Sequence, residues 1–166
     1  KELDELSKAR IRELRQAKKN GTPIIQYNGT FIPEEIIRAA GAETFLICRG
    51  GEPEPPEAVL DHILRFMNPL ARSMMGFLEL GLDYITPISD LIVTQQTDCH
   101  IARVTEMMEY KGIKICKVGV PTDWEKPIAF EYYLESLRKM VAMVEDITGS
   151  KVDWDKAREN FAKTNK

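Results

Sequence analysis

The stretch QYNGTFIPEEIIRAAG, residues 26–41, decides the fold because it changes from a strand pattern to a helix pattern across one turn. Residues 23–27 are short and rich in β-prone side chains, and an Asn-Gly pair at 28–29 follows them. Pro33 suits the first turn of a helix, where its missing N–H costs no hydrogen bond, and Gly41 suits the end of one. The stretch therefore predicts a strand, a turn and a helix in immediate succession.

The same alternation continues along the chain. A continuous apolar run, of the kind that parallel sheets bury on both faces, occurs at residues 44–48, and further strands are expected at residues 90–94 and 113–118. Helical patterns occur at residues 57–82, with a joint at Asn68-Pro69, and at 101–110, 127–147 and 153–166. Such alternation is typical of βαβ units, so we predict an α/β fold: a Rossmann-like open sheet of about four mostly parallel strands with helices on both faces.

The length of 166 residues predicts a single domain, since a chain of about 150 residues buries ~70% of the surface that it exposes when unfolded. Within this domain, residues 1–166, we expect an N-terminal helix over 1–20, a core over 23–120 and C-terminal helices over 126–166. The chain begins with Lys1 rather than methionine, and we expect it to be part of a longer chain.

Charge and cysteine usage exclude several classes of protein. The 23 basic and 26 acidic residues give a net charge of −3 without a basic block, which argues against a nucleic-acid partner. No apolar run approaches the ~20 residues of a membrane helix, so we expect no membrane association. The three cysteines contain no C-x-x-C pair and are odd in number, which argues against a disulfide framework and for a reducing, cytoplasmic location.

Open α/β sheets bind ligands beyond the carboxyl ends of their strands, which selects residues 27–30, 48–51, 95–100 and 119–124. Candidate binding residues within or near these stretches are Tyr27, Asn28, Gly29, Thr30, Gly50, Gly51, Asn68, Arg72, Asp98 and His100. The chain contains neither G-x-G-x-x-G nor a P-loop lysine, so we predict no nucleotide cofactor.

Cys99 follows a predicted strand and opens a predicted helix, where the helix dipole and His100 can stabilise a thiolate. It is a candidate nucleophile or metal ligand, and the alternative is a small side chain that fills the crevice. Asp98 is a ligand, a base or the N-cap of the helix, and the N-cap is the commoner role. Cys48 could face the same crevice, whereas Cys116 falls inside a strand and is expected in the core.

Five segments together resemble the first domain of the 2-hydroxyacyl-CoA dehydratase D-component family, which includes the related benzoyl-CoA reductase subunits and double-cubane cluster proteins. The segments are IPEEIIRAAGAETFLICRGG (32–51), MNPLARSMMGFLELG (67–81), SDLIVTQQTDCHIARVTEMMEY (89–110), ICKVGVPTDW (115–124) and EYYLESLRKM (131–140). The likeness extends over about residues 23–160 and depends on the order and spacing of the segments rather than on any one of them.

The resemblance implies two Rossmann-like domains with an iron–sulfur cluster between them, held by cysteines from loops at the strand ends. It also implies an ATP-dependent activator protein that delivers single electrons, and an acyl-CoA thioester as substrate. We therefore expect a subunit or domain of a radical 2-hydroxyacyl-CoA dehydratase or benzoyl-CoA reductase type enzyme. The expected partner is a second α/β domain or a partner subunit of the same family, in a dimer or a heteromeric assembly.

The chain departs from the family pattern at cysteine positions. Many relatives have cysteine in the turn before the Pro-Glu-Glu segment, where this chain has Gly29, and before the proline of the joint, where it has Asn68. The third family cysteine matches Cys99 or, with a one-residue shift, Asp98, and Cys99 is favoured as the candidate cluster ligand. We thus expect no iron–sulfur cluster held by this domain alone. The alternative function is a cluster-free paralogue that serves as a structural or assembly partner of a cluster-bearing subunit.

Overall fold

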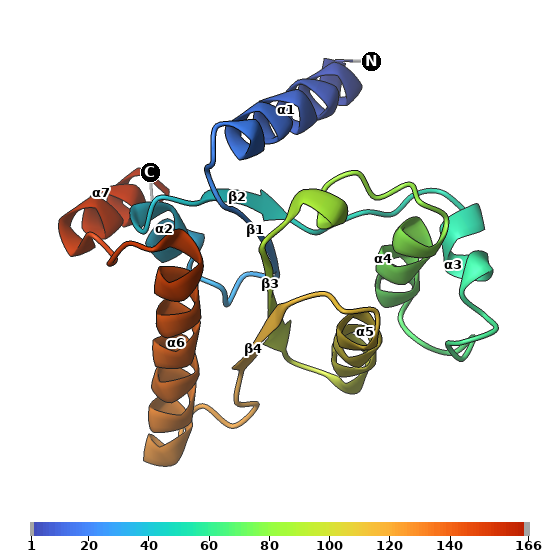
Figure 1. Cartoon of the computed structure of the whole chain (residues 1–166). Helices are drawn as coiled ribbons and strands as arrows, with labels where there is room; N and C mark the ends of the chain where they lie inside the picture. Colours follow the sequence, from blue (N-terminus) through green and yellow to red (C-terminus); the bar gives the residue numbers. More distant parts are fainter. Residues whose placement is uncertain (1, 165–166) are drawn as a thin grey trace.

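The computed structural model describes residues 2–164, with side chains from residue 5 onward, so the outermost residues of the predicted terminal helices lie outside the described part. Four strands form one sheet in the order β2-β1-β3-β4 (Figure 1). The strands are β1 (Ile24–Asn28), β2 (Glu43–Leu46), β3 (Leu91–Gln96) and β4 (Ile115–Gly119). All three strand pairs are parallel. The predicted α/β open sheet is confirmed, and it is wholly rather than mostly parallel.

The strand order places a topological switch point at the centre of the sheet. β1 pairs with β2 on one side, with Ile25 opposite Thr44, and with β3 on the other, with Ile25 opposite Leu91. The chain therefore moves outward in one direction after β1 and returns to build β3 and β4 in the other. In such sheets the loops beyond β1 and β3 diverge and leave a crevice between them.

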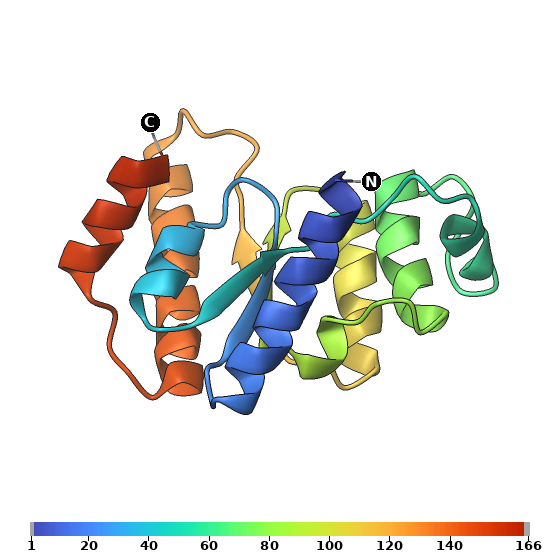
Figure 2. The ribbon, with the colours of Figure 1, turned by 90° about the horizontal axis from the view of Figure 1, so that it is seen from above.

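Seven α-helices surround the sheet within the described residues. They are α1 (Glu2–Lys19), α2 (Glu34–Ala39), α3 (Glu54–Ala58), α4 (Pro69–Glu79), α5 (Cys99–Tyr110), α6 (Pro127–Thr148) and α7 (Trp154–Thr164), with a 3₁₀ turn at Thr86–Ile88. Figure 2 shows α2, α6 and α7 on one side of the sheet and α3, α4 and α5 on the other. The prediction of helices on both faces is confirmed.

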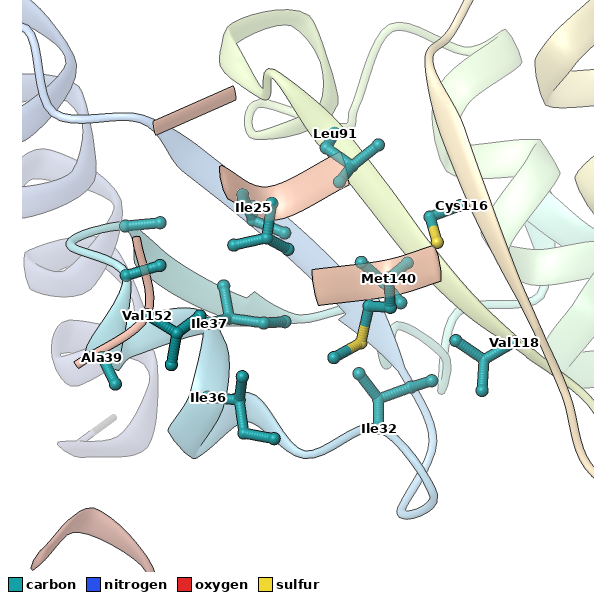
Figure 3. Close-up of a cluster of buried hydrophobic side chains, with 14 of the residues drawn as sticks. Ile25, Ile32, Ile36, Ile37, Ala39, Leu91, Cys116, Val118, Met140 and Val152 are labelled. Atoms are coloured by element: carbon teal, nitrogen blue, oxygen red, sulfur yellow. The ribbon is translucent and has the colours of Figure 1, made fainter. Parts of the chain in front are cut away.

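The larger core cluster lies between the sheet and the α2 and α6 side. Ile25, Leu91, Val93 and Val118 of the sheet are at most 1% exposed and face Met140 of α6, which is 0% exposed (Figure 3). Ile92 points to the opposite face, into a second cluster with side chains of α4 and α5. Burial on both faces explains why the central strand β3 begins with the uninterrupted apolar run Leu91-Ile92-Val93.

Of the two helices predicted over residues 57–82, with a joint at Asn68-Pro69, the first is wrong. α3 begins earlier and ends at Ala58, and residues 59–68 form turns before α4. The apolar side chains of Val59, Ile63 and Met67 recur at helical spacing, yet they are buried beneath a turn segment. Because burial alone sets that spacing here, the periodicity of a helix appears where no helix forms.

Arg72 holds this turn segment against α4. Its guanidinium donates to the carbonyl oxygens of Met67 and Pro56, each at 3.3 Å, and lies 3.6 Å from the Glu57 carboxylate. The side chain is 11% exposed, so its charge is compensated largely by these partners. Arg72 was predicted near a ligand pocket, and its observed contacts are with the backbone and side chain of α3 and the loop around it.

No helix in the described part of the chain combines the length and apolar character needed to cross a membrane.

Candidate functional site

A crevice of about 780 Å³ opens at the carboxyl edge of the sheet. Its walls come from the turn after β1 (residues 28–33), the ends of β2 and β3 with the chain after each (46–48 and 95–98), the first residues of α2, α4 and α5, and side chains of α6 and α7. We call it the switch-point crevice, because it lies where the loops after β1 and β3 diverge. Its size falls within the range of about 300–1,000 Å³ that is usual for ligand pockets.

Hydrogen bonds to the N–H and to the carbonyl of Phe31 hold the turn after β1 in place. The N–H of Phe31 donates to Oε1 of Gln95 at 3.1 Å, and its carbonyl accepts from the hydroxyl of Tyr133 at 2.6 Å. Gly29 has a φ of +93°, and a Cβ there would lie 1.9 Å from Cδ of Gln95. The Gln95 side chain therefore occupies the space that a side chain at position 29 would need and would have to move to admit one, while the positive φ itself favours glycine.

Two helix starts at the crevice are capped by the chain itself. Oδ1 of Asn68 accepts from the N–H of Leu70 at 2.8 Å at the start of α4. Oδ1 of Asp98 accepts from the N–H groups of His100 and Ile101, at 2.8 and 3.0 Å, at the start of α5. The N-cap interpretation of Asp98 is confirmed. Both polar side chains thus satisfy N–H groups that would otherwise point toward a ligand.

Replacing Asp98 with alanine is expected to lower the free energy of unfolding by about 1 kcal/mol, because two N–H groups of α5 lose their acceptor. Urea unfolding followed by circular dichroism measures the change. Asp98→Asn is the matched control and should retain most of the stability, since an asparagine oxygen also caps. An unchanged midpoint for Asp98→Ala would show that water replaces the cap at no cost.

The structure brings together six of the predicted site residues. Those that line the switch-point crevice are Tyr27, Asn28, Gly29, Thr30, Asn68 and Asp98. Cys99 and His100 instead line a separate hollow of about 340 Å³ between residues 62–67 and α5. Gly50 and Gly51 lie in the loop between β2 and α3 and are not among the residues that line the crevice.

The position of Cys99 follows from the cap that precedes it. Asp98 folds over the start of α5 at the crevice, and the helix then turns by about 100° per residue. Cys99 is therefore directed toward the neighbouring hollow, although the sequence predicted that it would face the crevice. Cys48 is exposed and does line the crevice, as the sequence allowed.

The donor set at the crevice does not fit an iron–sulfur cluster held by this chain alone. Such clusters are held by several cysteine thiolates, usually four, and Cys48 is the single thiol among the crevice residues that the structure describes. Within residues 5–164, no group of three or more His, Cys, Asp or Glu side chains is placed to hold a metal ion. Cys116 lies in the core, as predicted, where burial raises the pKa of its thiol to about 11.

The three thiols are expected to differ in reactivity. Cys48 and Cys99 are exposed and should react rapidly with a chromogenic disulfide reagent under native conditions, whereas Cys116 should react only after unfolding. The measurement is a thiol count before and after addition of denaturant, with expected values of two and three. Rapid reaction of all three native thiols would contradict the burial of Cys116.

Sequence reasoning did not single out Gln95, Tyr133 or Ile101, which all line the crevice. Residues 95–100 were selected as a stretch, but nothing local distinguishes Gln95 as the residue that holds a turn 64 positions earlier in the chain. Tyr133 lies in α6, 102 positions after Phe31, and its hydroxyl donates to the carbonyl of Phe31.

Comparison with known proteins adds two findings. Residues 29–166 match the family model described as 2-hydroxyglutaryl-CoA dehydratase, D-component. A curated relative, "Putative dehydratase subunit YjiM" of Escherichia coli (strain K12), is 26% identical over 168 aligned positions, which cover 99% of this chain and 43% of the relative. The chain therefore spans less than half the length of that relative.

Proposed function

The chain belongs to the 2-hydroxyglutaryl-CoA dehydratase D-component family, and from that membership we propose that it is one α/β domain of a 2-hydroxyacyl-CoA dehydratase. In this proposal the switch-point crevice holds the acyl-CoA thioester, and a second α/β domain or partner subunit closes it. The reaction is loss of water from the 2-hydroxyacyl group by single-electron chemistry, with an ATP-dependent activator as the source of electrons. The observation that carries the proposal is the crevice itself, at the switch point of a wholly parallel sheet.

The walls of the crevice suit an acyl thioester. Apolar side chains of Leu46, Ile47, Leu70 and Ile101 supply contact for an acyl chain. The hydroxyls of Thr30 and Thr97 are among the polar groups on the same walls, and they can orient a carbonyl or a hydroxyl group. Ligand pockets typically combine an apolar lining with a few such polar groups.

The proposal assigns the cluster to the partner rather than to this chain. The three family cysteine positions fall on Gly29, Asn68 and either Asp98 or Cys99, and of the last two residues Asp98 lines the crevice. In this chain the Gln95 side chain covers Gly29, while Asn68 and Asp98 each cap a helix. None of these three positions therefore supplies a thiolate in this chain. The thiolates for a cluster would have to come from another polypeptide or domain.

A test of the proposal measures the binding of a 2-hydroxyacyl-CoA to the protein together with its partner. Leu70 and Leu80 lie at opposite ends of α4 and are each 38% exposed, but Leu70 lines the crevice and Leu80 does not. Leu70→Glu should raise the Kd at least about tenfold, because a carboxylate replaces an apolar contact with the acyl group. Leu80→Glu, the matched control, should leave the Kd unchanged. Equal values for the two variants would place the substrate elsewhere.

The second candidate function is a cluster-free partner that serves structure or assembly. The packing of Gln95 over Gly29 favours it, since a filled ligand position is compatible with a domain that has no redox centre of its own. Iron and sulfide analysis after anaerobic purification, combined with the binding measurement, separates the two. The dehydratase domain should bind acyl-CoA in the complex, whereas a structural partner should form the complex without binding it. Iron retained by this chain alone, and lost on Cys48→Ser, would contradict the assignment of the cluster to the partner.

A further inference from the structure

A second hollow, of about 650 Å³, lies along the outer edge of β2. Its walls come from α1, α2, α7 and β2, and we call it the edge hollow. Tyr27, Glu34 and Leu46 line both the edge hollow and the switch-point crevice. The two therefore adjoin at these residues, and one elongated ligand can extend from one into the other.

Three cations from three different helices line the edge hollow: Arg10 of α1, Arg38 of α2 and Lys156 of α7. The hollow also contains the carboxylates of Glu34 and Glu43, so its net charge is about +1 in a chain whose net charge is −3. The sign of the charge is thus locally reversed, so the edge hollow can accept an anion.

Arg38 is held in a fixed orientation. Its Nε donates to the hydroxyl of Thr44 at 2.8 Å, and its Nη2 lies 3.0 Å from the carboxylate of Glu34. The Thr44 hydroxyl in turn donates to Glu34 at 2.9 Å, which closes a three-membered network. No described residue accepts a hydrogen bond from Nη1 of Arg38, and the Arg38 side chain is 50% exposed. A guanidinium with one free edge and a fixed plane is well suited to a phosphate group.

The other two cations complete the site. Nη2 of Arg10 donates to Glu43 at 2.6 Å and to the carbonyl of Thr44 at 3.2 Å, and its Nη1 donates to Glu13 at 3.2 Å. These contacts place a guanidinium, already paired with two carboxylates, against the unpaired edge of β2. Lys156 is exposed, and among the described residues no acceptor contacts its ammonium group. The lysine is therefore free to engage a bound anion as a mobile charge.

We propose that the edge hollow binds the phosphates of the CoA moiety while the switch-point crevice holds the acyl end of the same molecule. The inference rests on the proposed function, since it assumes that the ligand is an acyl-CoA thioester. Such a thioester has a polyanionic nucleotide at one end, an acyl group at the other and a flexible pantetheine arm between them. This distribution of charge matches a cationic hollow that adjoins a more apolar crevice.

The experiment compares an acyl-CoA with the corresponding acyl-pantetheine, which lacks the phosphates, as ligands of the protein with its partner. Acyl-CoA is expected to bind at least about tenfold more tightly, since a charge-assisted hydrogen bond contributes at least this much. Lys156→Gln and Arg38→Gln should each weaken acyl-CoA binding and leave acyl-pantetheine binding unchanged. Lys163→Gln, on the same helix as Lys156 but outside the hollow, is the matched control and should change neither.

The outcomes separate this inference from the proposed function. If both ligands bind and neither variant alters the affinity for acyl-CoA, the edge hollow is not the phosphate site, although the crevice remains the acyl site. If Lys156→Gln lowers the affinity for acyl-CoA and for acyl-pantetheine equally, the effect does not come from the phosphates and the inference fails. If neither ligand binds to the unaltered protein, the proposed function itself is wrong and the inference falls with it.

Discussion

Replacement of Gly76 by alanine is expected to destabilise the protein by about 2–3 kcal/mol, because an added methyl group overpacks the contact between α3 and α4. A Cβ at position 76 would lie 1.9 Å from the carbonyl oxygen of Pro55 and 2.3 Å from its carbonyl carbon. Both atoms belong to the backbone, so no side-chain rotation relieves the clash, and α3 must move away from α4. The sign is opposite to the usual one, since the same change inside an exposed helix stabilises by about 1 kcal/mol.

Urea unfolding of the Gly76→Ala variant measures this effect. The matched control is Gly50→Ala, because a Cβ at Gly50 would meet nothing within 4 Å and the residue does not have a positive φ. We expect the control to change the free energy of unfolding by less than about 0.5 kcal/mol, as for most surface substitutions. A Gly76→Ala variant at least as stable as the unaltered protein would mean that α3 does not pack on α4 as described.

Ile25→Ala is expected to lower the free energy of unfolding by about 2–5 kcal/mol, the usual range for an isoleucine truncated in a core. Ile25 lies in β1, between β2 and β3, and is 0% exposed (Figure 3). The loss combines the transfer free energy of the removed methyl groups with the cost of a cavity between the sheet and α2 and α6. Because β1 also leads into the turn at the switch-point crevice, its stability affects the site directly.

Two controls identify the mechanism of the Ile25 effect. Ile25→Val removes one methylene group and should cost about 0.5–1.5 kcal/mol. Ile128→Ala, at a side chain that is 66% exposed, should change the stability by less than about 0.5 kcal/mol. Similar losses for Ile25→Ala and Ile128→Ala would contradict the position of Ile25 in the core.

Sequence patterns predicted the centre of the sheet because β3 is buried on both faces. Residues 91–93, within the strand predicted over 90–94, form an uninterrupted apolar run for that reason, and the structure places β3 there. The same reasoning gave a wrong prediction for the segment before Asn68. Val59, Ile63 and Met67 recur every four residues, but turns bury them, and the contacts of Arg72 with Met67 and Pro56 hold those turns in place.

The candidate site was partly predictable because parallel strands end at one common edge. Tyr27 and Asp98 could be placed at the same crevice because each lies at the carboxyl end of a predicted parallel strand. The direction of Cys99 could not, because it depends on the cap geometry of Asp98 and on the packing of residues 62–67 beside α5. The role of Gln95 depends on a contact with Phe31, which only the folded chain brings within reach.

The edge hollow had no sequence signal at all. Arg10 and Glu43 are 33 positions apart, and Lys156 comes from the last helix. Arginine, lysine and glutamate are common surface residues, so nothing in their local sequence distinguishes these from the other charged side chains of the chain. Their convergence is a consequence of β2 being an edge strand, flanked by α1 on one side and α7 on the other.

Hydrogen exchange with and without a 2-hydroxyacyl-CoA tests the central claim, that the switch-point crevice is the substrate site, most directly. The ligand is expected to slow amide exchange in the turn after β1, residues 28–33, and in residues 95–98 at the end of β3, because both form walls of the crevice. Slowing in residues 62–67 and at the start of α5, around the hollow that contains Cys99, with no change at the crevice, would contradict it.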